Sequence, residues 1–88
     1  MNDTICALAT PQGGAISVIR ISGDKAIEYV SRIFTPRKGV SLVERRTHTV
    51  VFGDICTDGK EILDEVLVTI MRGPHSYTGE DSIEISCH

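Results

Sequence analysis

The chain of 88 residues has no tryptophan, and two phenylalanines and two tyrosines are its only aromatic residues. Its core must therefore be built mainly from aliphatic side chains. No apolar run approaches the roughly 18 residues that a membrane-spanning helix needs, and the first residues lack the charged and apolar regions of a secretory signal. These absences argue against a membrane partner and favour one small domain in the cytoplasm.

Positive charge is also scarce. Nine lysines and arginines stand against twelve acidic residues, so the net charge is −3. This balance argues against a domain that grips a phosphate backbone by charge alone. The densest basic stretch lies between residues 32 and 46, where polar neighbours favour a solvated connector over an RNA contact. Its cations are Arg32, Arg37, Lys38, Arg45 and Arg46.

Patterns for a disulfide framework, a metal site or a nucleotide loop are missing. Cys6, Cys56 and Cys87 form no Cys-x-x-Cys pair and lie in apolar runs, which predicts reduced thiols that pack as small hydrophobic groups. The three histidines are too widely spaced to indicate a metal. Gly13 and Gly14 precede a strand rather than a helix, which predicts a tight turn. No residue is predicted to be catalytic or to bind a metal.

The spacing of apolar residues predicts five strands and one helix. We expect the strands at residues 4–9, 15–21, 48–56, 61–71 and 82–87, and the helix at residues 24–34. Ser22 or Gly23 is predicted to cap the helix, and residues 35–47 are predicted to be a polar connector. This order of elements predicts an α+β fold, a mostly antiparallel sheet with a helix packed on it.

Side-chain alternation assigns faces to these strands. Residues 15–21 are apolar on both faces, which predicts a central strand covered on both sides. The chain stops directly after residues 82–87 with no closing helix, so we expect one sheet face to be poorly covered and residues 1–88 to be a single truncated domain. The predicted inward residues are Val66, Val68, Ile70, Ile83, Ile85 and Cys87, and the predicted outward residues are Ser82, Glu84 and Ser86.

Three charged residues interrupt the apolar strands. Arg20 lies within residues 15–21, where a guanidinium must reach an edge or pair with an acid or an anionic ligand. Asp64 and Glu65 are adjacent in a strand and so point to opposite faces, one solvated and the other toward the core side or a cleft. A carboxylate in a cleft suits a heterocycle rich in N–H groups. The alternative is an acidic pair that only flanks the turn at residues 57–60.

The stretch from Arg72 to Asp81 is longer than a plain hairpin connection and carries several polar side chains. Loops of this kind carry function more often than they merely connect. Gly79 is expected to supply an unusual backbone angle, and Tyr77 is suited to cover a ligand or a partner subunit. The alternative is a turn that only starts the last strand.

Five stretches together resemble one family. They are residues 3–5, 9–11, 13–23, 74–81 and 84–88, of which the block Ser-Tyr-Thr-Gly-Glu-Asp within 74–81 is the most specific. In this order and at these separations they resemble the N-terminal domain of the MnmE (TrmE) family of tRNA-modification GTPases. The resemblance covers essentially the whole chain.

The resemblance implies a fold similar to the tetrahydrofolate-binding domain of the glycine-cleavage aminomethyltransferase. It implies a domain that forms a homodimer and binds 5-formyltetrahydrofolate or a related tetrahydrofolate. In the family, the full protein hydrolyses GTP with Mg and K ions and works with MnmG, FAD and folate on the wobble uridine of tRNA. These 88 residues contain nothing that could hydrolyse GTP. The alternatives are a purely structural dimerisation module and a folate-dependent aminomethyltransferase-like domain.

The resemblance also implies folate contacts. Arg20 matches the arginine of the family's opening block, and Asp64 with Glu65 looks like the acidic strand segment whose acid meets the pterin ring, with Glu65 preferred. Folate has an anionic glutamate tail and a pterin rich in N–H groups, so one arginine and one carboxylate suit it. Tyr77, Thr78 and Glu80 match the loop block, where they serve the site, a dimer contact or the scaffold.

Overall fold

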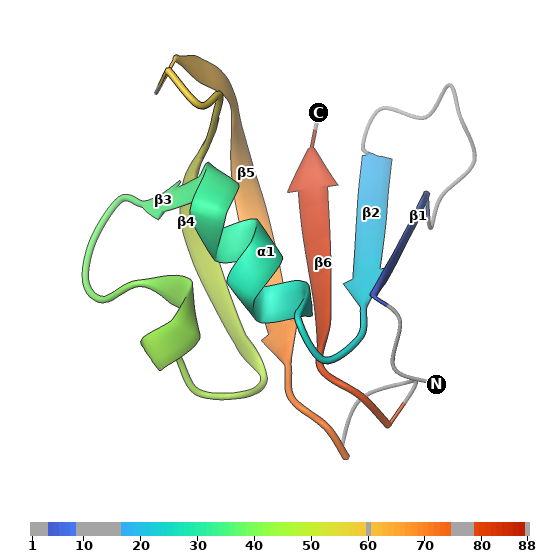
Figure 1. The fold of residues 1–88 in the computed structure, drawn as a ribbon. Coiled ribbons are helices and arrows are strands. Elements are labelled where there is room, and N and C mark those ends of the chain that lie inside the picture. Colours follow the sequence, from blue (N-terminus) through green and yellow to red (C-terminus); the bar gives the residue numbers. More distant parts are fainter. Residues whose placement is uncertain (1–3, 9–16, 60, 75–78, 88) are drawn as a thin grey trace.

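A computed structural model describes residues 4–8, 17–59, 61–74 and 79–87 of the chain. In these residues the chain forms six strands, one α-helix and one short 3-10 helix (Figure 1). The strands are β1 (Ile5–Leu8), β2 (Ser17–Ser22), β3 (Phe34–Pro36), β4 (Thr49–Cys56), β5 (Ile62–Met71) and β6 (Ser82–Cys87), and the helices are α1 (Ala26–Ile33) and η1 (Leu42–Glu44).

The six strands form one sheet in the order β1-β2-β6-β5-β4-β3, and every neighbouring pair is antiparallel. The helix α1 lies on one face of this sheet, in front of it in Figure 1, and packs against β6, β3 and η1. The predicted α+β class is therefore confirmed. The strands β4 and β5, which flank the turn expected at residues 57–60, pair with each other along their length.

The hydrophobic core lies between α1 and the sheet face that it covers. The helix contributes Ile27 and Val30, and Phe34 follows directly as the first residue of β3. Cys87 is half-buried against this core. The valines and isoleucines predicted to point inward are buried, so that alternation is confirmed. The sheet and η1 contribute Leu42, Val51, Val66, Val68, Ile70, Ile83 and Ile85.

The segment between α1 and β4 is more structured than the sequence suggested. Both β3 and η1 lie within the predicted polar connector, and the fully buried Leu42 packs η1 into the core. The predicted cap of the helix by Ser22 or Gly23 is wrong. Ser22 is part of β2, and the residue that precedes the helix, Lys25, makes no side-chain capping bond. The Gly23 carbonyl instead accepts a hydrogen bond from the Ala26 amide at 3.2 Å.

Burial departs from the prediction along β1, β2 and β6. Residues 17–21 of β2 are half-buried rather than covered on both faces, and Cys6 on the edge strand β1 is exposed. Both β1 and β2 are more exposed than predicted because the eight-residue helix α1 packs over β6 and β3. Ser82, predicted to point outward, is fully buried because its short side chain lies between its cross-strand neighbours Ser22 and Met71. Glu84 and Ser86 are half-buried.

We call the sheet face opposite α1 the open face. Its side chains alternate along each strand with those of the core. Val50, Phe52 and Leu67 lie on this face with 61%, 43% and 45% of their surface exposed. The expected poor covering of one sheet face is therefore confirmed for the described residues. The open face also carries the charged residues Arg20, Asp54, Glu65 and Glu84.

Gly53 allows β3 and β4 to approach each other. A Cβ atom at this position would lie 2.3 Å from the Thr35 carbonyl oxygen and 2.5 Å from Cζ of Phe34. Neither the backbone of β3 nor a buried aromatic ring can move away at small cost. Residue 53 must therefore be a glycine for β3 to pair with β4 at the edge of the sheet.

We expect Gly53→Ala to lower the free energy of unfolding by about 1–3 kcal/mol through overpacking. Gly59→Ala is the matched control, because a Cβ there has only an ordinary contact, 3.8 Å from Oγ1 of Thr57. Urea unfolding of both variants and the parent chain measures the difference. Equal stability of the two variants would contradict the close approach at Gly53.

Candidate functional site

Arg20 is held on the open face by an acid. Its Nε donates a hydrogen bond of 2.9 Å to Oε2 of Glu84, and its Nη2 contacts the same oxygen. The two residues are directly opposite each other on β2 and β6. Both side chains are partly buried, at 37% and 23% exposure. Of the alternatives that the sequence left open for Arg20, pairing with an acid is therefore confirmed.

A second ionic cluster lies at the other side of the open face. Nε and Nη2 of Arg37 donate hydrogen bonds of 3.0 and 2.8 Å to the two carboxylate oxygens of Asp54. Nη2 of Arg37 also lies 3.0 Å from Oε2 of Glu65. The guanidinium carbon lies 5.0 Å from the centre of the Phe52 ring. Two carboxylates and one aromatic ring therefore surround a single cation.

This cluster changes how Asp54 titrates. The hydrogen bonds from Arg37 lower the pKa of the Asp54 carboxyl, against the opposing effect of its burial. The hydrogen bond to Asp54 likewise raises the pKa of Arg37, with a further contribution from the charge of Glu65. The ion pair is therefore fully charged at neutral pH.

Asp64 and Glu65 point to opposite faces, as their adjacency predicts. Asp64 lies opposite Ile55 and is half-buried, whereas Glu65 lies opposite Asp54 on the open face and is exposed. Burial, and then the charge of Asp64, raises the pKa of the Cys87 thiol. Only Glu65 therefore joins the cluster on the open face.

Two shallow hollows share the Phe52 side chain as a wall. The first, the acidic hollow, has a volume of about 500 Å³. The second, the basic hollow, has a volume of about 250 Å³. The acidic hollow is lined by Phe52, Ile62, Leu63, Asp64 and Glu65, and the basic hollow by Arg37, Lys38, Arg45, Val50, Val51 and Phe52.

The long loop is only partly described. Tyr77 and Thr78 lie outside the described residues. Glu80 is half-buried at the base of the loop, where a Cβ on Gly73 would lie 3.1 Å from its Cα. Gly79 has a φ of +80°, so its predicted unusual angle is confirmed. The Asp81 side chain accepts a hydrogen bond of 3.0 Å from the Gly73 amide and so closes this base.

The predicted contacts Arg20 and Glu65 share a face but do not touch. Two strand spacings and four residues along a strand separate them, which places their Cα atoms about 16 Å apart. The sequence reasoning missed Asp54 and placed Arg37 in a solvated connector. The signal that could have found Asp54 was a charged residue within an apolar strand. The same signal singled out Arg20. Phe52 carried no such signal.

The described ranges offer little for other kinds of site. They contain no helix long and apolar enough to cross a membrane. In the same part of the chain, no three histidine, cysteine or acidic side chains gather as a metal site would require. The arrangement on the open face suits an organic ligand with N–H groups, a second protein surface, or both.

An antiparallel sheet with a helix on one face, and with apolar side chains and ion pairs on its open face, defines a small domain of the α+β class. A family model described as "GTP-binding protein TrmE N-terminus" matches residues 4–88. The chain therefore belongs to the TrmE/MnmE N-terminal domain family. This confirms the resemblance carried by the sequence blocks.

The chain is similar to proteins named tRNA modification GTPase MnmE. That of Bacteroides thetaiotaomicron is 60% identical over 87 residues, which cover 98% of this chain and 18% of the relative. That of Symbiobacterium thermophilum is 52% identical, with 98% and 19% covered. That of Phocaeicola vulgatus is 46% identical over 118 residues, with 98% and 24% covered. The chain thus spans between 18% and 24% of the length of these relatives.

We expect acid to destabilise the chain partly through Asp54. Because the folded state lowers the pKa of Asp54, the ion pair contributes fully above the ordinary aspartate value of about 4. That contribution is lost as the pH falls through the lower folded value. In Asp54→Asn the free energy of unfolding is expected to fall less than in the parent between about pH 5 and pH 2.

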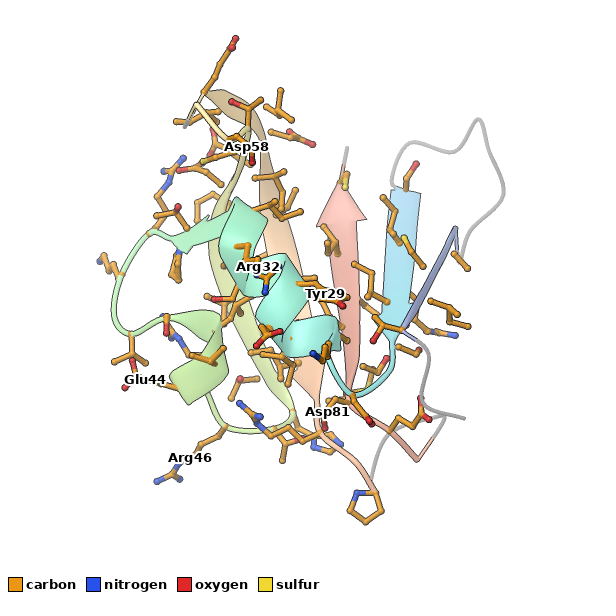
Figure 2. All side chains as sticks on the ribbon, viewed as in Figure 1. Tyr29, Arg32, Glu44, Arg46, Asp58 and Asp81 are labelled. Atoms are coloured by element: carbon orange, nitrogen blue, oxygen red, sulfur yellow. The ribbon has the colours of Figure 1, made fainter. Side chains whose placement is uncertain are left out.

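Urea unfolding at a series of pH values measures this difference. The control is Asp58→Asn in the exposed β4–β5 turn (Figure 2), which is expected to keep the acid sensitivity of the parent. Identical pH dependence in Asp54→Asn and the parent would show that the pair makes no such contribution.

Proposed function

We propose that the chain is the folate-binding and dimerisation domain of a GTPase that modifies the wobble uridine of tRNA. Family membership and the shared name of the relatives support the second half of this proposal. GTP, Mg and K ions, MnmG and tRNA belong, in this proposal, to the activity of the whole protein, and the cytoplasm is its site of action. The ligand of this domain is 5-formyltetrahydrofolate or a related tetrahydrofolate.

The observation that carries the folate proposal is the exposed carboxylate of Glu65 in the wall of the acidic hollow. Its neighbour in that wall is the Phe52 ring, whose side chain is 43% exposed. A pterin has a flat ring with an exocyclic amino group beside a ring N–H. Such a group donates to a carboxylate while its ring covers an aromatic or aliphatic surface.

Arg20 is the second proposed folate contact. It lies about 16 Å from Glu65 on the same face, which suits a long ligand with a heterocycle at one end and carboxylates at the other. A tail carboxylate there must share the guanidinium with Glu84, which uses two of its nitrogens. Asp64 also lines the acidic hollow but lies on the core side of the strand, opposite Ile55, and is the weaker of the two acidic candidates. Tyr77, Thr78 and Glu80 stay proposed contacts of the loop.

We expect Glu65→Ala and Arg20→Ala each to weaken the binding of 5-formyltetrahydrofolate by about ten-fold or more, because each removes a charged hydrogen-bond partner. Calorimetric titration of the chain measures the affinity, with the Bacteroides thetaiotaomicron relative titrated beside it. Glu28→Ala and Arg32→Ala are the matched controls, since these two exposed residues of α1 pair with each other. Arg32 is labelled on this helix in Figure 2. Unchanged affinity in either site variant removes that residue from the site.

The dimer proposal rests on the apolar side chains of the open face. Leu67 is 45% exposed there, in the same cross-strand row as Phe52, and a chain this small gains much of its burial from association. We expect Leu67→Glu to shift the chain to monomer in sedimentation velocity, because a carboxylate must then be desolvated. Ile33→Glu is the control: Ile33 is 40% exposed on α1, on the other side of the molecule.

The same experiment separates this proposal from a purely structural dimerisation module. A folate-binding domain sediments with bound 5-formyltetrahydrofolate, whereas a structural module dimerises to the same extent without taking up the ligand. A parent chain that stays monomeric at all concentrations contradicts the dimer.

A further inference from the structure

We propose that Arg37 is a positioning residue: held by Asp54, it aims Glu65 into the acidic hollow and so sets a preference for heterocycles that carry an exocyclic amino group. This inference rests on the proposed function, because it assigns a role at the same site. Arg37 lies in the segment between α1 and β4, outside the five sequence blocks that carry the family resemblance.

Arg37 is fixed at both ends. Its backbone amide donates a hydrogen bond of 3.0 Å to the Phe52 carbonyl, which continues the pairing of β3 with β4. Its guanidinium donates two hydrogen bonds to Asp54, whose side chain is only 12% exposed, and lies over the Phe52 ring. A cation anchored in this way gives a defined position to anything that it contacts.

Glu65 has the most exposed side chain of the three ion-paired residues, at 54% against 45% for Arg37 and 12% for Asp54. Arg37 contacts it through Oε2. A carboxylate has about four lone-pair positions, so the other oxygen, Oε1, stays available for a donor in the hollow. Without Arg37, a ligand would have to order a free glutamate side chain when it binds. The contact therefore prepares Glu65 for a ligand N–H group.

The charges show why Arg37 positions an acid rather than binding an anion. Two carboxylates, Asp54 and Glu65, already surround it. An anionic ligand at this guanidinium would meet both of them. The useful group in the cluster is therefore the exposed oxygen of Glu65, which recognises a donor, and Arg37 acts through it.

The test compares two ligands in the 88-residue chain: 5-formyltetrahydrofolate and an analogue that lacks the 2-amino group. Arg37→Ala is expected to weaken binding of the amino-bearing ligand by roughly 2- to 10-fold, the cost of ordering one side chain, and to leave the analogue nearly unchanged. Arg37→Lys, which keeps a cation near Glu65, is expected to recover part of the discrimination. Arg32→Ala on α1 is the arginine control.

The ratio of the two affinities separates positioning from a structural role, because loss of structure lowers both affinities together. A parent chain that binds 5-formyltetrahydrofolate but keeps the same ratio in Arg37→Ala overturns this inference and leaves the proposed function standing. A parent chain that binds neither ligand overturns the proposed function as well. If Arg37→Ala does not fold, Asp54→Asn, which loosens the anchor of Arg37, is judged by the same ratio.

Discussion

A six-stranded sheet has two faces, and the described part of this chain has one α-helix, of eight residues, with which to cover them. The helix and η1 cover the face that carries the buried valines and isoleucines of β5 and β6. On the other face, Val50, Phe52 and Leu67 of β4 and β5 are 61%, 43% and 45% exposed. Because strand side chains alternate, every second residue of these two strands points away from the core. The composition of the open face follows from this one limit.

On the open face, which α1 does not cover, paired charges lie among apolar side chains. Arg20 is paired with Glu84, and Arg37 with Asp54 and Glu65, so each cation has an acid on a neighbouring strand. Partly exposed ion pairs contribute only modestly to stability because water and side-chain entropy offset the attraction. Their main value here is geometric, since they fix the direction of long side chains on the face that α1 does not cover.

The sequence was a good guide wherever hydrophobic alternation decides the structure. Val66, Val68 and Ile70 are buried as their period-two spacing indicates, and the acids at 64 and 65 point to opposite faces. Alternation cannot specify which strands become neighbours across long connections. It therefore suggested that Arg20 pairs with an acid without naming Glu84, which is 64 positions further along the chain.

The sequence also could not predict the burial of single residues or the presence of short strands, for a related reason. Ser82 is a small polar residue in an outward position, and only its place between two flanking strands buries it. The three-residue strand β3 is too short to show a period, and its docking depends on Gly53, far away in β4. Arg37 follows β3 directly in a segment that looks like a polar connector. The pairing of β3 with β4 places Arg37 beside Asp54, so the sequence could not predict this cluster.

In the proposed function, a ligand and a second copy of the chain both use the open face, and this ties its two halves together. Phe52 lines both hollows, and Leu67 is its direct cross-strand partner, so the ligand site and the apolar surface meet in one row of side chains. Two binding events that share a surface cannot be independent. If folate binds the dimer more tightly than the monomer, it must strengthen the dimer by the same factor. If it binds the monomer more tightly, it must dissolve the dimer to the same extent. In the proposed function, the row that contains Phe52 and Leu67 is therefore the place where ligand binding and association are coupled.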